Sequence, residues 1–160
     1  MEKYQELRDK ALKNLKIADH MLTQTYPLVN DPKLLLTVLE NLFLALTNSM
    51  GSLLHYERLN KRIPPFQDSF ESKFNMFKMK LVEKHNIDKE MVYFVGDVKN
   101  MIVSHKKSPV EFSRKGVFVM CSEDYKMKVL APEDLKKNIA KTRQFLDSMN
   151  SIISKSEVKI

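Results

Sequence analysis

Glycine and cysteine are scarce in this 160-residue sequence, and each scarcity excludes a class of site. The three glycines, Gly51, Gly96 and Gly116, are too scattered to build a glycine-rich phosphate-binding loop. The single cysteine, Cys121, excludes an internal disulfide and favours a reducing compartment. Its neighbours along the chain carry no charge that would activate a thiol, so we expect Cys121 to be inert packing.

Long apolar runs are also missing. The first ten residues, MEKYQELRDK, are charged where a signal peptide needs an apolar segment. The most apolar stretch, 34–54, is interrupted by polar residues such as Glu40, Asn41 and Asn48, which argues against a membrane span. Together with the lone cysteine, these features predict a cytoplasmic protein that does not associate with a membrane.

The formal net charge is +7, from 27 basic and 20 acidic residues. An excess of positive charge favours anionic partners, and nucleic acid is the first of these. The sequence contains no RNA-recognition aromatic motif, zinc-finger spacing or arginine-rich tract that would narrow this choice.

Apolar residues recur every three or four positions in five segments, and this period predicts five helices. Proline at 27 is expected to end the first helix, prolines at 64 and 65 separate the second from the third, and Pro109 follows the fourth. Aspartates at 31 and 88 are expected to cap the second and fourth. The predicted helices cover residues 2–25, 32–62, 66–81 with a phenylalanine stripe, 88–108, and a last helix that begins at 132.

After the fourth predicted helix, the period of the apolar residues changes to two. Residues 117–121 and 126–130 alternate in this way and flank the polar turn 122–125, which predicts a β-hairpin. The sequence therefore predicts a mainly α fold, a five-helix up-and-down bundle with one hairpin at about 117–130. We expect a single domain over 1–155 and a frayed tail at 156–160.

Near the end of the fourth predicted helix the sequence reads KNMIVSH, from Lys99 to His105. This stretch resembles the signature of the HEPN superfamily (higher eukaryotes and prokaryotes nucleotide-binding domains). That signature is arginine, a polar residue that is commonly asparagine, four to six residues, and histidine. Here Asn100 and His105 match, and Lys99 stands where the arginine belongs. Lysine keeps the positive charge but loses the planar fork that grips a phosphate through two bonds.

The resemblance implies a metal-independent endoribonuclease that needs no cofactor, or an inactive relative that binds RNA. His105 would assist proton transfer, Lys99 would place positive charge at the phosphate, and Asn100 would donate a hydrogen bond. On one helix, Lys99 and His105 point about 120° apart, so one copy cannot aim both at one phosphate. The resemblance therefore also implies a homodimer with a shared cleft.

Basic residues near the motif suggest an RNA-binding patch, or equally an ordinary solvated face. They are Lys106, Lys107, Arg114, Lys115, Lys126 and Lys128.

Two other classes of function stay open. His105 would also be explained if it only packs near the C-terminal end of the helix, where the helix dipole favours positive charge. Lys99 and Asn100 would then be solvated surface residues. The protein would then be a non-catalytic dimerisation or scaffold module with a protein partner. The four histidines fall on four different predicted helices, an arrangement from which a bundle can build a metal-dependent hydrolase site. No pair of them has metal-ligand spacing, so we expect no metal.

Overall fold

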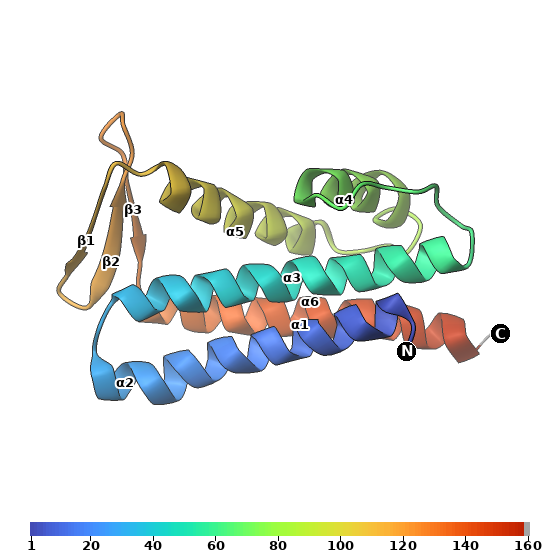
Figure 1. The fold of residues 1–160 in the computed structure, drawn as a ribbon, viewed down its shortest axis with the longest axis horizontal. Helices are drawn as coiled ribbons and strands as arrows, with labels where there is room; N and C mark the ends of the chain where they lie inside the picture. Colours follow the sequence, from blue (N-terminus) through green and yellow to red (C-terminus); the bar gives the residue numbers. More distant parts are fainter. Residues whose placement is uncertain (159–160) are drawn as a thin grey trace.

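The computed structural model describes residues 1–158 and confirms a mainly α fold. Figure 1 shows three long helices side by side, with two further helices along one side of the middle helix and a small sheet at one end. The helices are α1 (Lys3–His20), continued by η1 (Met21–Thr25) and α2 (Tyr26–Val29), α3 (Lys33–Leu59), α4 (Phe70–Met76), continued by η2 (Phe77–Leu81), α5 (Lys89–Lys107) and α6 (Pro132–Val158).

Helix α3 lies at the centre of the fold and contacts α1, α4, α5 and α6. Its leucines at 35, 39, 42, 46, 53 and 54 are fully buried, as its apolar sequence predicted. By length and composition alone this helix would suit a membrane span, with a mean hydropathy of 1.3 over 18 residues. In the structure the same apolar residues form the core between the other helices.

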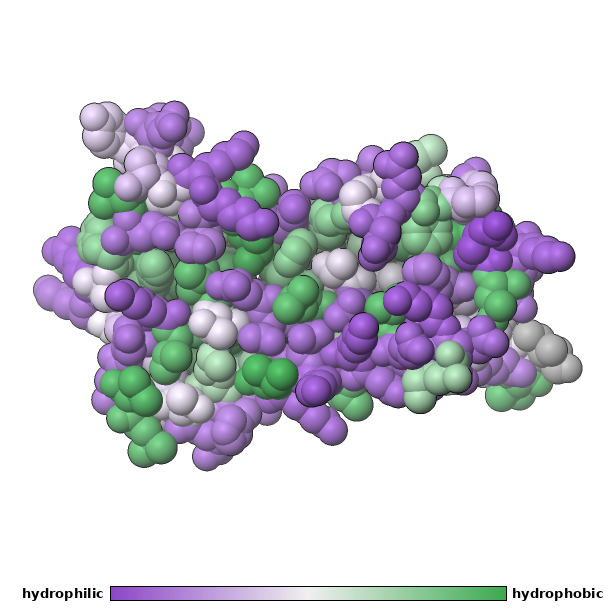
Figure 2. Space-filling model, in the orientation of Figure 1, coloured by the Kyte–Doolittle hydropathy of each residue, from purple (hydrophilic) through white to green (hydrophobic). Residues whose placement is uncertain are grey.

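The prediction that Pro27 ends the first helix was wrong. The chain widens into a π-helical turn over Met21–Thr25 and continues as α2 to Val29. Proline lacks an amide proton and crowds the carbonyl four residues earlier, so a wider turn before it lets the helix continue. Asn30, in the left-handed region at φ 54°, ends α2, and its amide donates to the Tyr26 carbonyl. This leaves Leu28 and Val29 exposed, and Figure 2 shows a hydrophobic patch at this corner.

The third helix begins later than predicted. Ser69 caps it, its hydroxyl accepting a hydrogen bond from the Ser72 amide, so Phe66 lies before the helix. The phenylalanine stripe nonetheless packs inward, with Phe70 against Phe43 and Phe77 fully buried beside Phe145.

Helix α5 follows the prediction closely. The Asp88 carboxylate accepts from the Glu90 amide at its start, and Ser108 ends it one residue before Pro109. Val95, Val98 and Ile102 are buried.

The predicted hairpin is part of a three-stranded antiparallel sheet, ordered β1 (Val110–Arg114), β2 (Val117–Cys121) and β3 (Met127–Leu130). The β2–β3 pairing was predicted, and β1 was missed. Strands β1 and β2 are joined by the two residues Lys115 (φ 47°) and Gly116 (φ 80°). Positive φ at both positions is the geometry of a tight hairpin turn, which glycine favours. Val110 and Phe112 alternate with polar residues in β1, which is the period of a strand.

The prediction that the chain frays from residue 156 was wrong over 156–158, because α6 continues to Val158. Two tyrosines hold its last turn, with Tyr4 Oη donating to Glu157 at 2.8 Å and Tyr56 Oη to Ser156 at 2.9 Å. Residues 159–160 lie outside the described part of the chain.

A buried charge cluster joins the end of α3 to the segment after η2. The Glu57 carboxylate is 1% exposed and is contacted by three basic side chains. Arg62 Nε and Lys84 Nζ lie 2.7 and 3.0 Å from its Oε2, and His85 Nε2 lies 2.7 Å from its Oε1. Burial alone would raise the pKa of the Glu57 carboxyl, but the hydrogen bonds from Arg62, Lys84 and His85 outweigh it and lower that pKa.

Candidate functional site

His105 lies in the last turn of α5, where the chain turns into β1. The Ser108 hydroxyl lies 2.6 Å from the Cys121 carbonyl and ties this junction to β2. The chain then returns past the helix end, so that Glu111 Oε2 lies 2.8 Å from His105 Nδ1. The histidine and glutamate side chains are 29% and 23% exposed. His105 is thus neither sealed in the core nor freely solvated, and its ring is oriented by a carboxylate.

Lys99 faces a different part of the molecule. Its ammonium lies 4.9 Å from the ring centre of Phe70 and 5.4 Å from that of Phe43, and 3.6 Å from the Glu71 carboxylate. These contacts fix it between α5, α3 and α4. Asn100 is exposed. Within one protomer the structure therefore does not bring Lys99 to His105, which agrees with the angle expected from one helix.

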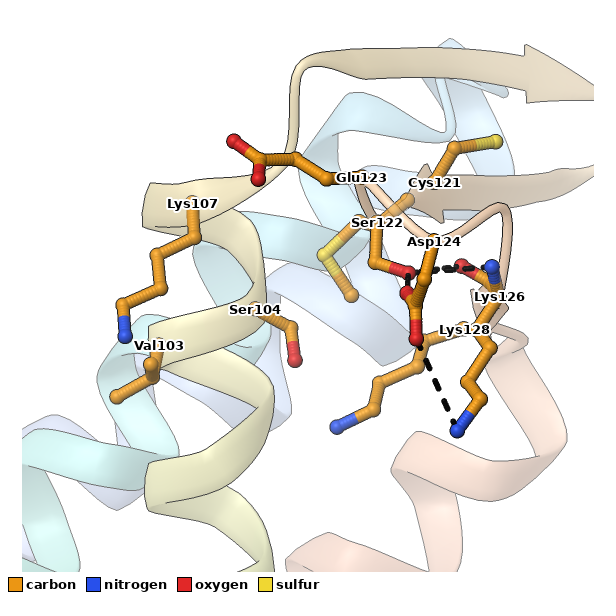
Figure 3. Close-up of a pocket in the computed structure, with 10 residues that line it drawn as sticks. Val103, Ser104, Lys107, Cys121, Ser122, Glu123, Asp124, Lys126 and Lys128 are labelled. Atoms are coloured by element: carbon orange, nitrogen blue, oxygen red, sulfur yellow. Dashed lines mark hydrogen bonds and ion pairs between the residues drawn. The ribbon is translucent and has the colours of Figure 1, made fainter.

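A groove of about 630 Å³ lies between the second half of α5 and the β2–β3 hairpin (Figure 3). Three of the predicted RNA-binding lysines line it: Lys107 from α5, and Lys126 and Lys128 from the hairpin. Val103 and Met120 supply apolar surface, and the hydroxyls of Ser104 and Ser122 add hydrogen-bonding groups. We call this feature the lysine groove.

The lysine groove has an excess of one positive charge, because Glu123 and Asp124 also line it. The Ser122 hydroxyl donates to Asp124 and lowers the pKa of that carboxyl, which also pairs with Lys126 at 3.8 Å. None of the ion pairs formed within residues 1–158 uses Lys107 or Lys128. In Figure 3 the side chains of Lys126 and Lys128 extend in the same direction from the hairpin, and Glu123 points to the opposite end. Two lysines are therefore free to bind an anion.

The His105–Glu111 pair and the lysine groove lie on the same face of the sheet. Met120 in the central strand pairs with Glu111 on one side and with Lys128 on the other, so the three side chains point the same way. Neighbouring strands are about 4.8 Å apart, which puts the backbones of Glu111 and Lys128 about 10 Å apart. A bound chain of phosphates could therefore contact both features.

The remaining predicted basic residues are not gathered in the groove. Lys106 is exposed beside Lys107, while Arg114 and Lys115 lie at the β1–β2 turn at the other end of the strands. That turn contacts the end of the first helix, where Tyr26 Oη donates to the Gly116 carbonyl at 3.1 Å. The predicted patch of six basic residues is therefore divided between the two ends of the sheet.

The histidines do not converge on a metal site, and no group of three or more potential ligands occurs among residues 1–158. His85 and His105 pair with different glutamates. His55 packs against Phe66, with ring centres 5.1 Å apart, and burial lowers the pKa of its imidazole. Cys121 is a half-buried free thiol at the rim of the groove.

Glu111 is the residue that sequence reasoning missed. It was not among the candidate site residues predicted from the sequence. The sequence feature that could have revealed its role is its position six residues after His105. Between them, Pro109 ends the helix, and the resulting turn can bring the two side chains together.

No protein-family model, curated protein or solved structure significantly matches this sequence. The similarity to the HEPN superfamily therefore rests on the Lys99–His105 motif and its place near the end of α5, and it stays a prediction.

Proposed function

We propose that this protein binds RNA, and that the lysine groove is where it binds the phosphate backbone. The observation that carries the proposal is that Lys107 from α5, and Lys126 and Lys128 from the hairpin, line one groove. Lysine ammonium groups bind phosphates without regard to sequence, and hydroxyls such as those of Ser104 and Ser122 add hydrogen bonds. The net charge of +7 supports the same partner through long-range attraction.

Fluorescence anisotropy with a labelled RNA tests this proposal. We expect a variant with Lys107→Ala, Lys126→Ala and Lys128→Ala to bind about 10- to 100-fold more weakly, because each lost contact costs about 0.5–1 kcal/mol. The matched control carries Lys10→Ala, Lys13→Ala and Lys16→Ala, which removes the same charge from exposed positions on α1. Equal weakening in both variants, or none in the groove variant, would contradict the proposal.

The His105–Glu111 pair favours a second candidate function, a metal-independent ribonuclease. In a neutral imidazole, a hydrogen bond from Nδ1–H to the Glu111 carboxylate places the lone pair on Nε2, which can then act as a base. In that reaction the RNA 2′-oxygen attacks phosphorus while His105 Nε2 takes the 2′ proton. The bond between phosphorus and the 5′-oxygen breaks, and a second acid protonates that oxygen. Because Lys99 of the same protomer faces Phe70 and Glu71 on α4, the groove lysines would supply the positive charge.

The homodimer implied by the HEPN resemblance also remains a proposal, as does a cytoplasmic location. A second copy would supply the second acid or base that the reaction needs, since each protomer offers one His105 at this place. If the protein binds no RNA, the scaffold alternative remains.

A further inference from the structure

The turn between β2 and β3 presents one aromatic ring to solvent beside the lysine groove. Tyr125 is 93% exposed, the most exposed aromatic residue among those with large exposed apolar side chains. It lies between Asp124 and Lys126, both of which line the groove. An aromatic side chain normally gains stability by burial, and Tyr125 gains almost none.

The backbone at Tyr125 has an unfavourable conformation. Tyr125 has φ 63°, in the left-handed region, which costs a residue with a side chain about 1–2 kcal/mol. Hydrogen bonds within the turn maintain it: the Tyr125 amide donates to the Ser122 carbonyl at 3.0 Å, and the Ser122 amide to the Lys126 carbonyl at 2.8 Å. The Lys126 amide also donates to the Ser122 hydroxyl at 3.1 Å. Packing does not explain an aromatic residue here, and strain of this kind is common where a protein holds a ligand.

The combination of a cationic groove and an exposed ring matches the chemistry of an unpaired nucleic-acid strand. Lysines follow the phosphates of such a strand, and aromatic rings stack on its bases. In a duplex the bases are stacked on one another and present only their edges, so an exposed ring has no base face to contact. A single strand would engage both features, whereas a duplex would engage only the lysines.

We infer that the lysine groove takes unpaired RNA, one base of which stacks on Tyr125. This inference rests on the proposed function, and it adds the class of RNA and a second contact residue. The phosphate next to the stacked base contacts Lys126 or Lys128, and the strand runs along the groove toward α5.

Binding of a labelled single strand of roughly 12 nucleotides, and of the same strand annealed to its complement, tests the inference. Tyr125→Phe keeps the ring, and Tyr125→Asn removes it while suiting a positive φ. We expect the Phe variant to bind the single strand within about twofold of the wild type. The Asn variant should bind about 5- to 150-fold more weakly, the equivalent of the 1–3 kcal/mol typical of one stacked base. Neither variant should change the weaker binding of the duplex.

A fluorescent reporter gives a second readout. The protein has no tryptophan, so Tyr125→Trp introduces a single one. Stacking on a base should quench its fluorescence when the single strand is added, and the duplex should leave it unchanged.

The outcomes separate the two proposals. If Tyr125→Asn binds the single strand as tightly as the wild type while the triple lysine variant does not, stacking is wrong and the RNA-binding groove stands. If the wild type binds the duplex as tightly as the single strand, the inference is also wrong. If the wild type binds neither RNA, the proposed function fails together with it.

Discussion

Cleavage of RNA in the presence of a chelator is expected to fall about 100- to 10,000-fold when His105 is replaced by alanine, the usual contribution of a positioned acid or base. The reason is the geometry at the end of α5, where Glu111 Oε2 lies 2.8 Å from Nδ1 and orients the ring. RNA affinity should change little, because the variant leaves the three groove lysines in place. Time courses of a labelled RNA on denaturing gels measure the rate.

Two controls sharpen this prediction. His20→Ala removes an exposed histidine from α1 and should cleave like the wild type. Glu111→Gln should also lower the rate, because an amide can donate to Nδ1 and so favour the tautomer that carries its proton on Nε2. Identical cleavage by the wild type and His105→Ala, or no cleavage by either, would remove the ribonuclease candidate and leave RNA binding alone.

Replacing Glu57 with glutamine is expected to lower the free energy of unfolding at neutral pH by about 3 kcal/mol. The change leaves the charges of Arg62 and Lys84, and the His85 ring, without their shared buried partner. The loss should fall at the low end of the range for broken buried pairs, because these three side chains are 19–40% exposed and can be hydrated. Urea unfolding followed by circular dichroism measures the difference, with Glu40→Gln at an exposed position of α3 as the control.

The Glu57 contribution should depend on pH in a defined direction. Because the folded state lowers the pKa of Glu57 below its ordinary value of 4.5, the stabilisation is fully present above that value. It is lost as the pH falls through the folded-state pKa, where the carboxyl takes up a proton. The stability difference between wild type and Glu57→Gln should therefore shrink in acid. A difference that is absent at neutral pH, or equally large in acid, would contradict this account.

The helical part of the fold could be predicted from the sequence because burial imposes a simple period. Leu135, Ile139, Leu146, Met149 and Ile153 recur at helical spacing along α6, and all are buried. The capping residue Asp88 and the proline after Ser108 likewise fixed the ends of α5. Such local rules fail where contacts between residues far apart in the sequence determine the local structure. The last turn of α6 has a polar sequence, and hydrogen bonds from Tyr4 in α1 and Tyr56 in α3 hold it in place.

The candidate site was harder to predict because it depends on how elements pack. Sequence proximity grouped Lys99 with His105, and the helix instead turns Lys99 toward Phe70 on α4. Proximity also grouped Arg114 and Lys115 with the hairpin lysines, but the unrecognised strand β1 carries them to the other end of the sheet. Glu111 shows the same limit, since its contact with His105 exists only because the chain reverses at Pro109.

The salt dependence of RNA binding tests the central claim most directly. Each phosphate contact on a single strand contributes about 0.7 to the slope of log affinity against log salt concentration. If Lys107, Lys126 and Lys128 each contact a phosphate, their replacement with alanine should reduce that slope by about 2 relative to the wild type. The α1 control variant should keep the wild-type slope. A groove variant whose slope equals that of the wild type would show that these lysines do not hold RNA.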